Sequence, residues 1–362
     1  MERSEIERLA ARCERRLNGH RRDEQSPHRV LVRLAATIDP DLDGDLYGQG
    51  RIIADFEREI AELLGKEAAL FLPSGTMAQQ IALRIWSERT GRVSVGFHPT
   101  CHLELHEQKG YARLHGLHGV LIGPPHRMLT RADLDQVSEP LAALLLELPQ
   151  REIGGQLPTW DELGTLLDWA RERGTATHLD GARLWECGPF YQREYAEIAA
   201  LFETVYVSFY KILGGITGAA LAGPGEIIAE ARIWQRRHGG NLVRMYPFVL
   251  AARLGLRERL PRMASYHRHA VAIADALRGE AGITVVPDPP PTNMMQVHLR
   301  GSRDRLDEAS LRYAESTGRW LFHPLRPGPT PDQGFFELVV GDATLEWSPQ
   351  EVRDALRQVV AE

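Results

Sequence analysis

Lysine is rare in this chain, and one lysine stands where its amine could do chemistry. Only three of the 43 basic residues are lysines: Lys66, Lys109 and Lys211. Lys211 follows the apolar run 203–209 and precedes the glycine-rich stretch 213–218. A primary amine forms a Schiff base with an aldehyde, which a guanidinium does not, and burial lowers the pKa of the amine. Lys211 is therefore a candidate covalent anchor for a carbonyl compound, with an ordinary lysine as the alternative.

A second candidate is the triplet Ser74, Gly75 and Thr76, which directly follows the apolar run 68–73 and opens a helical pattern. Free backbone N–H groups, two hydroxyls and a glycine that permits close approach would suit a phosphate. A plain helix cap by Ser74 is the alternative. Neither a G-x-G-x-x-G nor a Walker motif occurs in the sequence.

A third candidate is the stretch His-Leu-Asp-Gly-Ala-Arg at 178–183, in which Asp180 ends an apolar run. Asp180 could hold a cationic heterocycle, ligate a metal or cap the next segment. Arg183 could bind a carboxylate through its planar guanidinium. An ordinary Asp–Arg surface pair is the alternative.

Taken together, the three candidates suit pyridoxal 5′-phosphate. This cofactor has a phosphate for residues 74–76, a pyridine nitrogen for Asp180 and an aldehyde for Lys211. Each candidate lies at the end of a predicted strand, where α/β folds bind their ligands. The ordered set is more specific than any single member.

Short apolar runs that alternate with helical patterns must position these residues, which predicts a mostly parallel sheet covered by helices on both faces. After about residue 240 the pattern changes to that of a smaller α+β lobe. We expect an N-terminal helical arm (1–50), a large cofactor-binding domain (51–245) and a small C-terminal domain (246–362). The predicted strands are 68–73, 92–97, 118–123, 141–149, 176–180, 203–209 and 216–223.

The sequence resembles the threonine aldolase and β-eliminating lyase family of fold-type-I pyridoxal phosphate enzymes, as a divergent member. The resemblance rests mainly on Gly-Lys-Glu-Ala-Ala-Leu-Phe-Leu-Pro-Ser-Gly-Thr-Met (65–77) and Asp-Gly-Ala-Arg (180–183). Shorter matches lie at 45–48, 101–104, 208–214 and 292–294.

The resemblance implies roles for individual residues. Lys211 would form the Schiff base with the cofactor, Asp180 would keep the pyridine nitrogen protonated, and His102 would stack on the ring. The implied catalytic residues are Lys211, His102 and Asp180. The implied cofactor contacts are Ser74, Gly75, Thr76, His102, Asp180, Ser208 and Lys211.

The family's substrate site looks altered in this sequence. Arg183 would contact the substrate carboxylate, and Tyr47 would reach the site of a neighbouring subunit in a homodimer or homotetramer. Gln150 stands where the family has a histidine that handles the substrate hydroxyl, and Glu337 replaces a second carboxylate-binding arginine. Arg326 is the candidate replacement for that arginine.

The expected reaction is aldol-type cleavage or formation of the Cα–Cβ bond of a β-hydroxy amino acid, by a lyase of amino acid metabolism. Because Gln150 is no base, the hydroxyl proton would pass to His102, His106 or a water. Other reactions of the same cofactor stay open: β-elimination, transamination and racemisation. A binding protein that holds the cofactor without catalysis is a further alternative.

A remote alternative is a metal-dependent hydrolase that uses His98, His102 and His106, whose spacing of four would place them on one face of a helix. Pro99 argues against a helix through His98, and the stretch lacks H-E-x-x-H. We therefore expect no metal.

Composition narrows the partners and the location. A net charge of −6 over 362 residues gives no reason to expect nucleic acid or a membrane surface as a partner. Three widely spaced cysteines fit a reducing cytoplasm, and we read neither a signal peptide nor a membrane span in the sequence.

Overall fold

The structure is a computed structural model that describes residues 2–21 and 26–362. This part of the chain forms two compact units, residues 34–261 and the N-terminal residues up to 33 together with 262–362. We call them the sheet unit and the terminal unit. The predicted division into 1–50, 51–245 and 246–362 stays a prediction, and residues 1 and 22–25 of the predicted arm lie outside the described residues.

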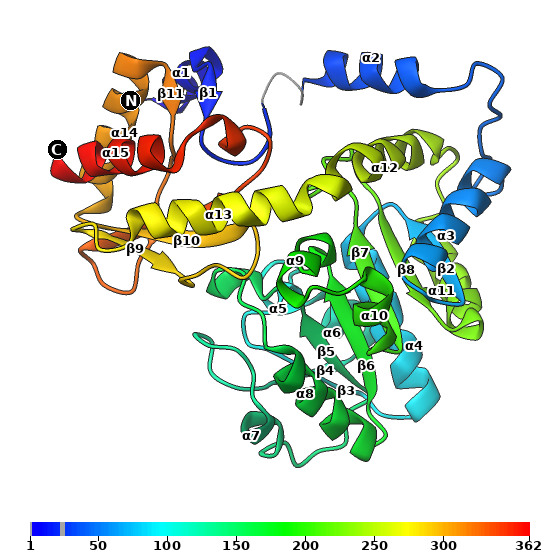
Figure 1. The fold of residues 1–362 in the computed structure, drawn as a ribbon. Helices are drawn as coiled ribbons and strands as arrows, with labels where there is room; N and C mark the ends of the chain where they lie inside the picture. Colours follow the sequence, from blue (N-terminus) through cyan, green and yellow to red (C-terminus); the bar gives the residue numbers. More distant parts are fainter. Residues whose placement is uncertain (1, 22–25) are drawn as a thin grey trace. The chain divides into compact units, whose positions relative to one another are not determined.

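The sheet unit is built on a sheet with the strand order β2-β8-β7-β6-β5-β3-β4 (Figure 1). Strands β4, β3, β5, β6 and β7 are mutually parallel, whereas β8 runs antiparallel to both β7 and β2. The prediction of a mostly parallel sheet is therefore confirmed. The bounds are β2 Ala68–Leu72, β3 Ser94–Phe97, β4 His118–Leu121, β5 Ala143–Glu147, β6 Ala176–Gly181, β7 Thr204–Ser208 and β8 Ala219–Gly223.

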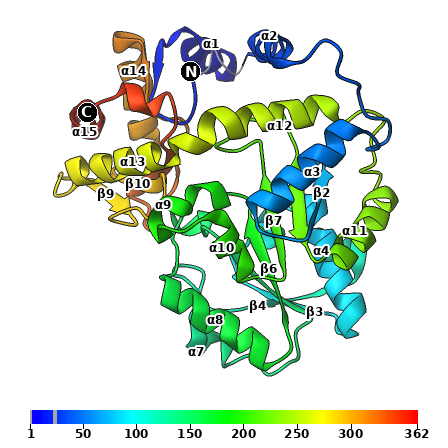
Figure 2. The ribbon, with the colours of Figure 1, turned by 45° about the vertical axis from the view of Figure 1, so that its right-hand side comes forward.

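Burial explains why the inner strands have no polar alternation. Every residue of β5, β6, β7 and β8 is buried, because helices lie on both sides of the sheet (Figure 2). Any polar residue inside these strands therefore needs a specific partner. The helices of this unit are α3 Arg51–Leu63, α4 Gly75–Thr90, α5 His102–Leu105, α6 Gly110–His115, α7 Arg131–Leu134, α8 Trp160–Glu172, α9 Gly188–Tyr191, α10 Tyr195–Ala200, α11 Gly225–Arg237 and α12 Tyr246–Arg259.

The chain between β3 and β4 forms two short helices, α5 and α6. Gln108 and Lys109 separate them with φ of 52° and 55°, in the left-handed region. The break turns the chain after His106, so that Glu107 points back towards α5.

The terminal unit carries an antiparallel sheet with the order β12-β13-β10-β9. The N-terminal strand β1 pairs in parallel with β11, and Asn18 hydrogen-bonds the backbone of β13 at Glu337 and Val339. The bounds are α1 Arg3–Arg12, β1 Arg15–Arg16, α13 Met263–Leu277, β9 Ile283–Val286, β10 Met294–Arg300, α14 Arg303–Thr317, β11 Arg319–Trp320, β12 Arg326–Pro327, β13 Gln333–Val339 and α15 Pro349–Ala361.

Helix α2, Pro27–Thr37, spans the boundary between the two units. No helix of the described residues combines the length and the apolar character that a membrane span requires.

Candidate active site

The direction of the strands gathers the predicted residues at one edge of the sheet. Strands β2, β3, β5, β6 and β7 run the same way, so their carboxyl ends share that edge. Residues 74–76 follow β2, His102 follows β3, Gln150 follows β5, Asp180 lies near the end of β6, and Lys211 follows β7. The sequence order of the candidates is thereby converted into a spatial cluster.

Lys211 is partly buried in a cluster of charges. Burial, together with the charge of Arg183, lowers the pKa of its amine to about 8. The carboxylates of Asp180, Glu147 and Glu186 act in the opposite direction. At neutral pH a larger fraction of this amine is neutral, and so nucleophilic, than in an ordinary lysine.

The other two lysines are committed elsewhere. Lys66 Nζ donates to the carbonyl of Phe202, and Lys109 Nζ lies 2.7 Å from a carboxylate oxygen of Glu104. Lys211 is therefore the lysine that this edge of the sheet offers to an aldehyde.

Asp180 is a buried carboxylate with hydrogen-bonding capacity left over. It is 1% exposed, and it accepts hydrogen bonds from the backbone N–H of Ala182 (3.1 Å) and from Gln79 Nε2 (2.8 Å). A carboxylate has about four lone-pair positions, so Asp180 can still accept from a protonated ring nitrogen. The Oε1 atom of Gln79 is buried and has no hydrogen-bond partner.

The start of α4 matches the predicted phosphate site, but the structure requires a glycine at position 75 for a different reason from the one expected. Ser74 is the N-cap residue and makes no side-chain cap hydrogen bond, so its hydroxyl and the first-turn N–H groups are not used by a cap. A Cβ on Gly75 would lie 1.9 Å from Tyr206 Oη. A buried tyrosine, and not only the approach of an anion, therefore requires glycine here.

Ser208 is less suited to a phosphate than expected from the sequence. It is buried, and its Oγ donates to the carbonyl of Ala182 at 2.7 Å. Trp185 Nε1 donates in turn to the carbonyl of Ser208. The Ser208 hydroxyl thus stabilises the turn after β6. Its single O–H group donates to Ala182 and is not free to donate to a phosphate.

Tyr47 lies on an exposed turn that is fixed from behind. Its ring is 53% exposed and its φ is 51°. Asp45, which is fully buried, accepts hydrogen bonds from the N–H groups of Met245 and Tyr246, each at 2.8 Å, and from that of Gly48. The turn is thus rigidly attached to the start of α12, while the Tyr47 ring faces outwards.

Glu147 is a site residue that the sequence reasoning missed. It is the last residue of β5 and stands opposite Asp180 in the strand register. Burial and the charge of Asp180 raise the pKa of Glu147 to about 7, against the opposing effects of the Arg151 N–H, Arg183 and Lys211. The signal was a lone glutamate within the apolar run 141–149.

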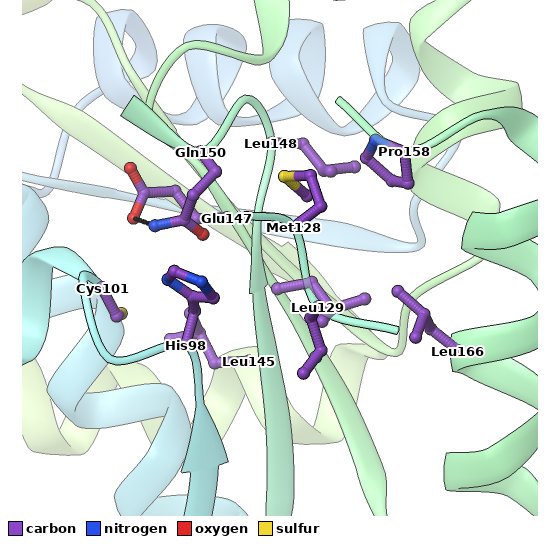
Figure 3. A pocket seen from close by; sticks show the side chains of 11 residues that line it. His98, Cys101, Met128, Leu129, Leu145, Glu147, Leu148, Gln150, Pro158 and Leu166 are labelled. Atoms are coloured by element: carbon purple, nitrogen blue, oxygen red, sulfur yellow. Dashed lines mark hydrogen bonds between the residues drawn. The ribbon is translucent and has the colours of Figure 1, made fainter. Parts of the chain in front are cut away.

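Gln150 is tied to Glu147, as Figure 3 shows in a small pocket beside His98, Met128 and Leu166. Gln150 Nε2 donates to Glu147 Oε2 at 3.2 Å and to Thr100 Oγ1 at 3.1 Å. Both of its N–H bonds are therefore used.

Arg326 and Glu337 lie in the terminal unit. Both line a pocket of about 330 Å³ together with Asn18, His323 and Phe336. The guanidinium of Arg326 lies 5.2 Å from the centre of the Phe335 ring. The structure thus brings these two predicted residues together within their own unit.

The histidines 98, 102 and 106 do not converge. His98 Nε2 lies 3.1 and 2.9 Å from the carbonyl oxygens of Pro124 and Arg127. His102 and His106 are neighbours, with ring centres 5.1 Å apart. The described residues contain no group of three or more His, Cys, Asp or Glu that could hold a metal ion, so the hydrolase alternative has no ligand set there.

Comparison with known proteins gives a consistent result. The profile of the family described as Beta-eliminating lyase matches residues 33–300. The low specificity L-threonine aldolase of Escherichia coli O157:H7 is 30% identical over 285 residues, 75% of this chain and 81% of that protein. Aldolase vrtJ of Penicillium aethiopicum is 34% identical over 232 residues, which are 62% of this chain and 58% of the length of that relative.

A solved structure from Listeria monocytogenes EGD-E is similar over its whole length. That protein is described as a candidate L-allo-threonine aldolase. It is 40% identical, covers 99% of both chains and superposes with a TM-score of 0.94.

Proposed function

The chain belongs to the beta-eliminating lyase family and is a pyridoxal phosphate-dependent lyase; from this premise we propose that it cleaves the Cα–Cβ bond of a β-hydroxy amino acid to an aldehyde and glycine. The observation that carries the proposal is the Lys211 amine, whose pKa burial lowers to about 8 beside Asp180. Bound pyridoxal phosphate would supply an electron-accepting ring for the electron pair of the broken bond.

The residues of this chain fit that cofactor at three points. Lys211 offers a nucleophilic amine, and Asp180 retains lone pairs for a protonated ring nitrogen. The start of α4 offers N–H groups and the Ser74 and Thr76 hydroxyls for the phosphate. Arg183, whose charge acts on Lys211, would bind a substrate carboxylate.

Gln150 supports an altered handling of the substrate hydroxyl. An amide takes up no proton at neutral pH, and both N–H bonds of Gln150 are used by Glu147 and Thr100. Gln150 can offer a substrate hydroxyl only its acceptor oxygen. It therefore orients the hydroxyl, and another group removes the proton.

The substrate carboxylate is the second altered feature. Where the family has an arginine, Glu337 would repel a carboxylate, and Arg326 in the same pocket would compensate. Weak cleavage of threonine by the native enzyme follows from this proposal.

The test is to incubate the holoenzyme with threonine, allo-threonine and phenylserine and to measure aldehyde and glycine. The proposal expects both products in equal amounts, and none from Lys211→Ala. A holoenzyme that deaminates or racemises amino acids while no β-hydroxy amino acid yields an aldehyde would contradict it.

β-Elimination, transamination or racemisation is the second candidate, and Gln150 favours it. These reactions begin by loss of the Cα proton, so they need no base for a hydroxyl. Exchange of the Cα hydrogen of alanine with deuterated solvent, without cleavage of phenylserine, would select this candidate.

A homodimer or homotetramer is proposed from the surface around Tyr47. Leu46, Tyr47 and Val243 are between 51% and 53% exposed, and the Tyr47 N–H donates to the carbonyl of Val243, so an isolated subunit would leave neighbouring apolar side chains in water. A partner that covers them would receive the Tyr47 ring. For the cytoplasm, support comes from Cys13, Cys101 and Cys187, which are buried free thiols.

A further inference from the structure

His102 is held by a buried carboxylate that no predicted role accounts for. His102 Nδ1 lies 3.0 Å from Glu107 Oε1, and the Glu107 side chain is 1% exposed. Glu107 Oε2 accepts a hydrogen bond from Gln80 Nε2 at 3.2 Å. Gly110 backs this amide, since a Cβ there would lie 2.4 Å from Gln80 Nε2. The carboxylate is thus fixed at both oxygens.

Two adjacent glutamines of α4 each donate a hydrogen bond to a buried carboxylate. Gln79 donates to Asp180, and Gln80 donates to Glu107. In each, the carboxylate fixes the amide orientation, because the opposite orientation would set oxygen against oxygen. The Oε1 atoms of both are buried without a hydrogen-bond partner, so each amide uses its N–H groups at the expense of its oxygen.

The surroundings of His102 belong to the site. The residue before it, Cys101, is buried where the charges of Glu147, Asp180 and Glu107 all raise its thiol pKa. Tyr206 on β7 also lies within reach of the charges of Asp180 and Glu107. Burial raises the pKa of both Cys101 and Tyr206, so neither competes for a proton at neutral pH.

The neighbouring His106 is supported differently. Its Nε2 lies 2.9 Å from Glu152 Oε1, and the same oxygen accepts from Arg151 at 3.1 Å. The charge of Glu152 is therefore already balanced by a cation. Glu104, on α5, is likewise taken by Lys109 and Tyr111. Among the described residues only Gln80 and His102 hydrogen-bond the Glu107 carboxylate, so it is available to an imidazolium at His102.

We propose that Glu107 and Gln80 are positioning residues that fix the Nδ1–H tautomer of His102, so that its Nε2 accepts the proton of the substrate β-hydroxyl. This rests on the proposed aldol reaction. The proton passes from oxygen to Nε2, the O–H electrons form the aldehyde C=O, and the Cα–Cβ pair stays on Cα. His102 Nε2 then gives up this proton, Cα takes one up to form glycine, and no oxidant is required. Glu107 balances the imidazolium charge.

The direct test is nitrogen NMR of the holoenzyme labelled at histidine, with the His102 signal assigned by His102→Asn. The native protein should show neutral His102 protonated at Nδ1 and unprotonated at Nε2. Glu107→Gln should move His102 towards the opposite tautomer, because the carboxylate that accepts the Nδ1–H is lost. The opposite tautomer in the native protein, which needs no variant, would overturn the proposal.

Kinetics supply the second readout. Glu107→Gln should reduce kcat for phenylserine about 10- to 100-fold with KM within about two-fold, because the base is misoriented while substrate binding is kept. Glu107→Asp should recover part of kcat, and Gln80→Leu should give a smaller loss of the same kind. Glu152→Gln, the matched control at His106, should change neither kcat nor the His102 signal.

The outcomes separate this proposal from the proposed function. A native holoenzyme without aldol activity but with the expected tautomer, lost in Glu107→Gln, would overturn only the reaction. An active enzyme in which Glu107→Gln leaves the His102 tautomer and kcat unchanged would overturn only the positioning role. If Glu107→Gln does not fold, the activity of Gln80→Leu and the His102 tautomer of the native protein still test the positioning role.

Discussion

Replacing Glu147 by glutamine should make the stability of the protein less dependent on pH. Burial and the charge of Asp180 raise the pKa of Glu147 from 4.5 to about 7. A difference of this size corresponds to about 3 kcal/mol in the free energy of unfolding. Because the folded-state pKa is the higher one, the contribution is complete below pH 4.5 and is lost as the pH rises through 7.

The assay is urea unfolding of the cofactor-free protein at pH 4.5 and pH 8.5. Between the two, the advantage of Glu147→Gln over the native protein should change by about 3 kcal/mol in favour of the variant. The variant also loses or strains the hydrogen bonds to Gln150 and Arg151, which changes the free energy of unfolding by the same amount at both pH values. The difference between the two pH values therefore isolates the effect of the carboxyl group. Glu62→Gln, at a side chain that is 73% exposed, is the control.

Parallel pH curves for the native protein and Glu147→Gln would refute this reasoning. They would mean that Glu147 is as readily ionised in the folded protein as in the unfolded chain. The account of a buried carboxylate pair formed by Glu147 and Asp180 would then be wrong.

Three further outcomes follow from particular contacts. Gly75→Ala should lower the free energy of unfolding by about 1–3 kcal/mol in urea, because its Cβ would displace the buried Tyr206; an unchanged midpoint would show that the ring moves freely. Asp45→Ala should release the turn that carries Tyr47, so sedimentation should show monomer at micromolar concentration where the native protein shows oligomer; an unaltered oligomer would separate that turn from assembly. Glu337→Arg should increase cleavage of threonine and Arg326→Ala should reduce it, and efficient native cleavage insensitive to both would remove these residues from the substrate site.

The sequence predicts those features whose cause is local. The strands of the inner sheet are short runs of buried, largely apolar residues, and the residues at or just after their ends, Asp180 and Lys211, are chemically distinctive. The parallel arrangement of the strands then determines that these ends meet. This is why the fold class and the cofactor were predictable.

Features that depend on partners distant in the chain could not be predicted from the sequence. Glu147 is a single glutamate in an apolar run until the register sets it beside Asp180. Glu107 is held in place by a hydrogen bond from Gln80, which lies 27 residues earlier in the chain. Gly75 reads as a phosphate contact until Tyr206, from another strand, is seen against it. Periodicity carries no information about such pairs.

Lys211 is the residue proposed to bind the cofactor covalently, and the chain contains only two other lysines that could do so, Lys66 and Lys109. Borohydride reduction of the holoenzyme, followed by peptide mass spectrometry, measures this directly. The account predicts a phosphopyridoxyl adduct on the peptide that contains Lys211, and bleaching of the visible absorbance. An adduct on Lys66 or Lys109, or no adduct on a protein that holds the cofactor, would contradict it.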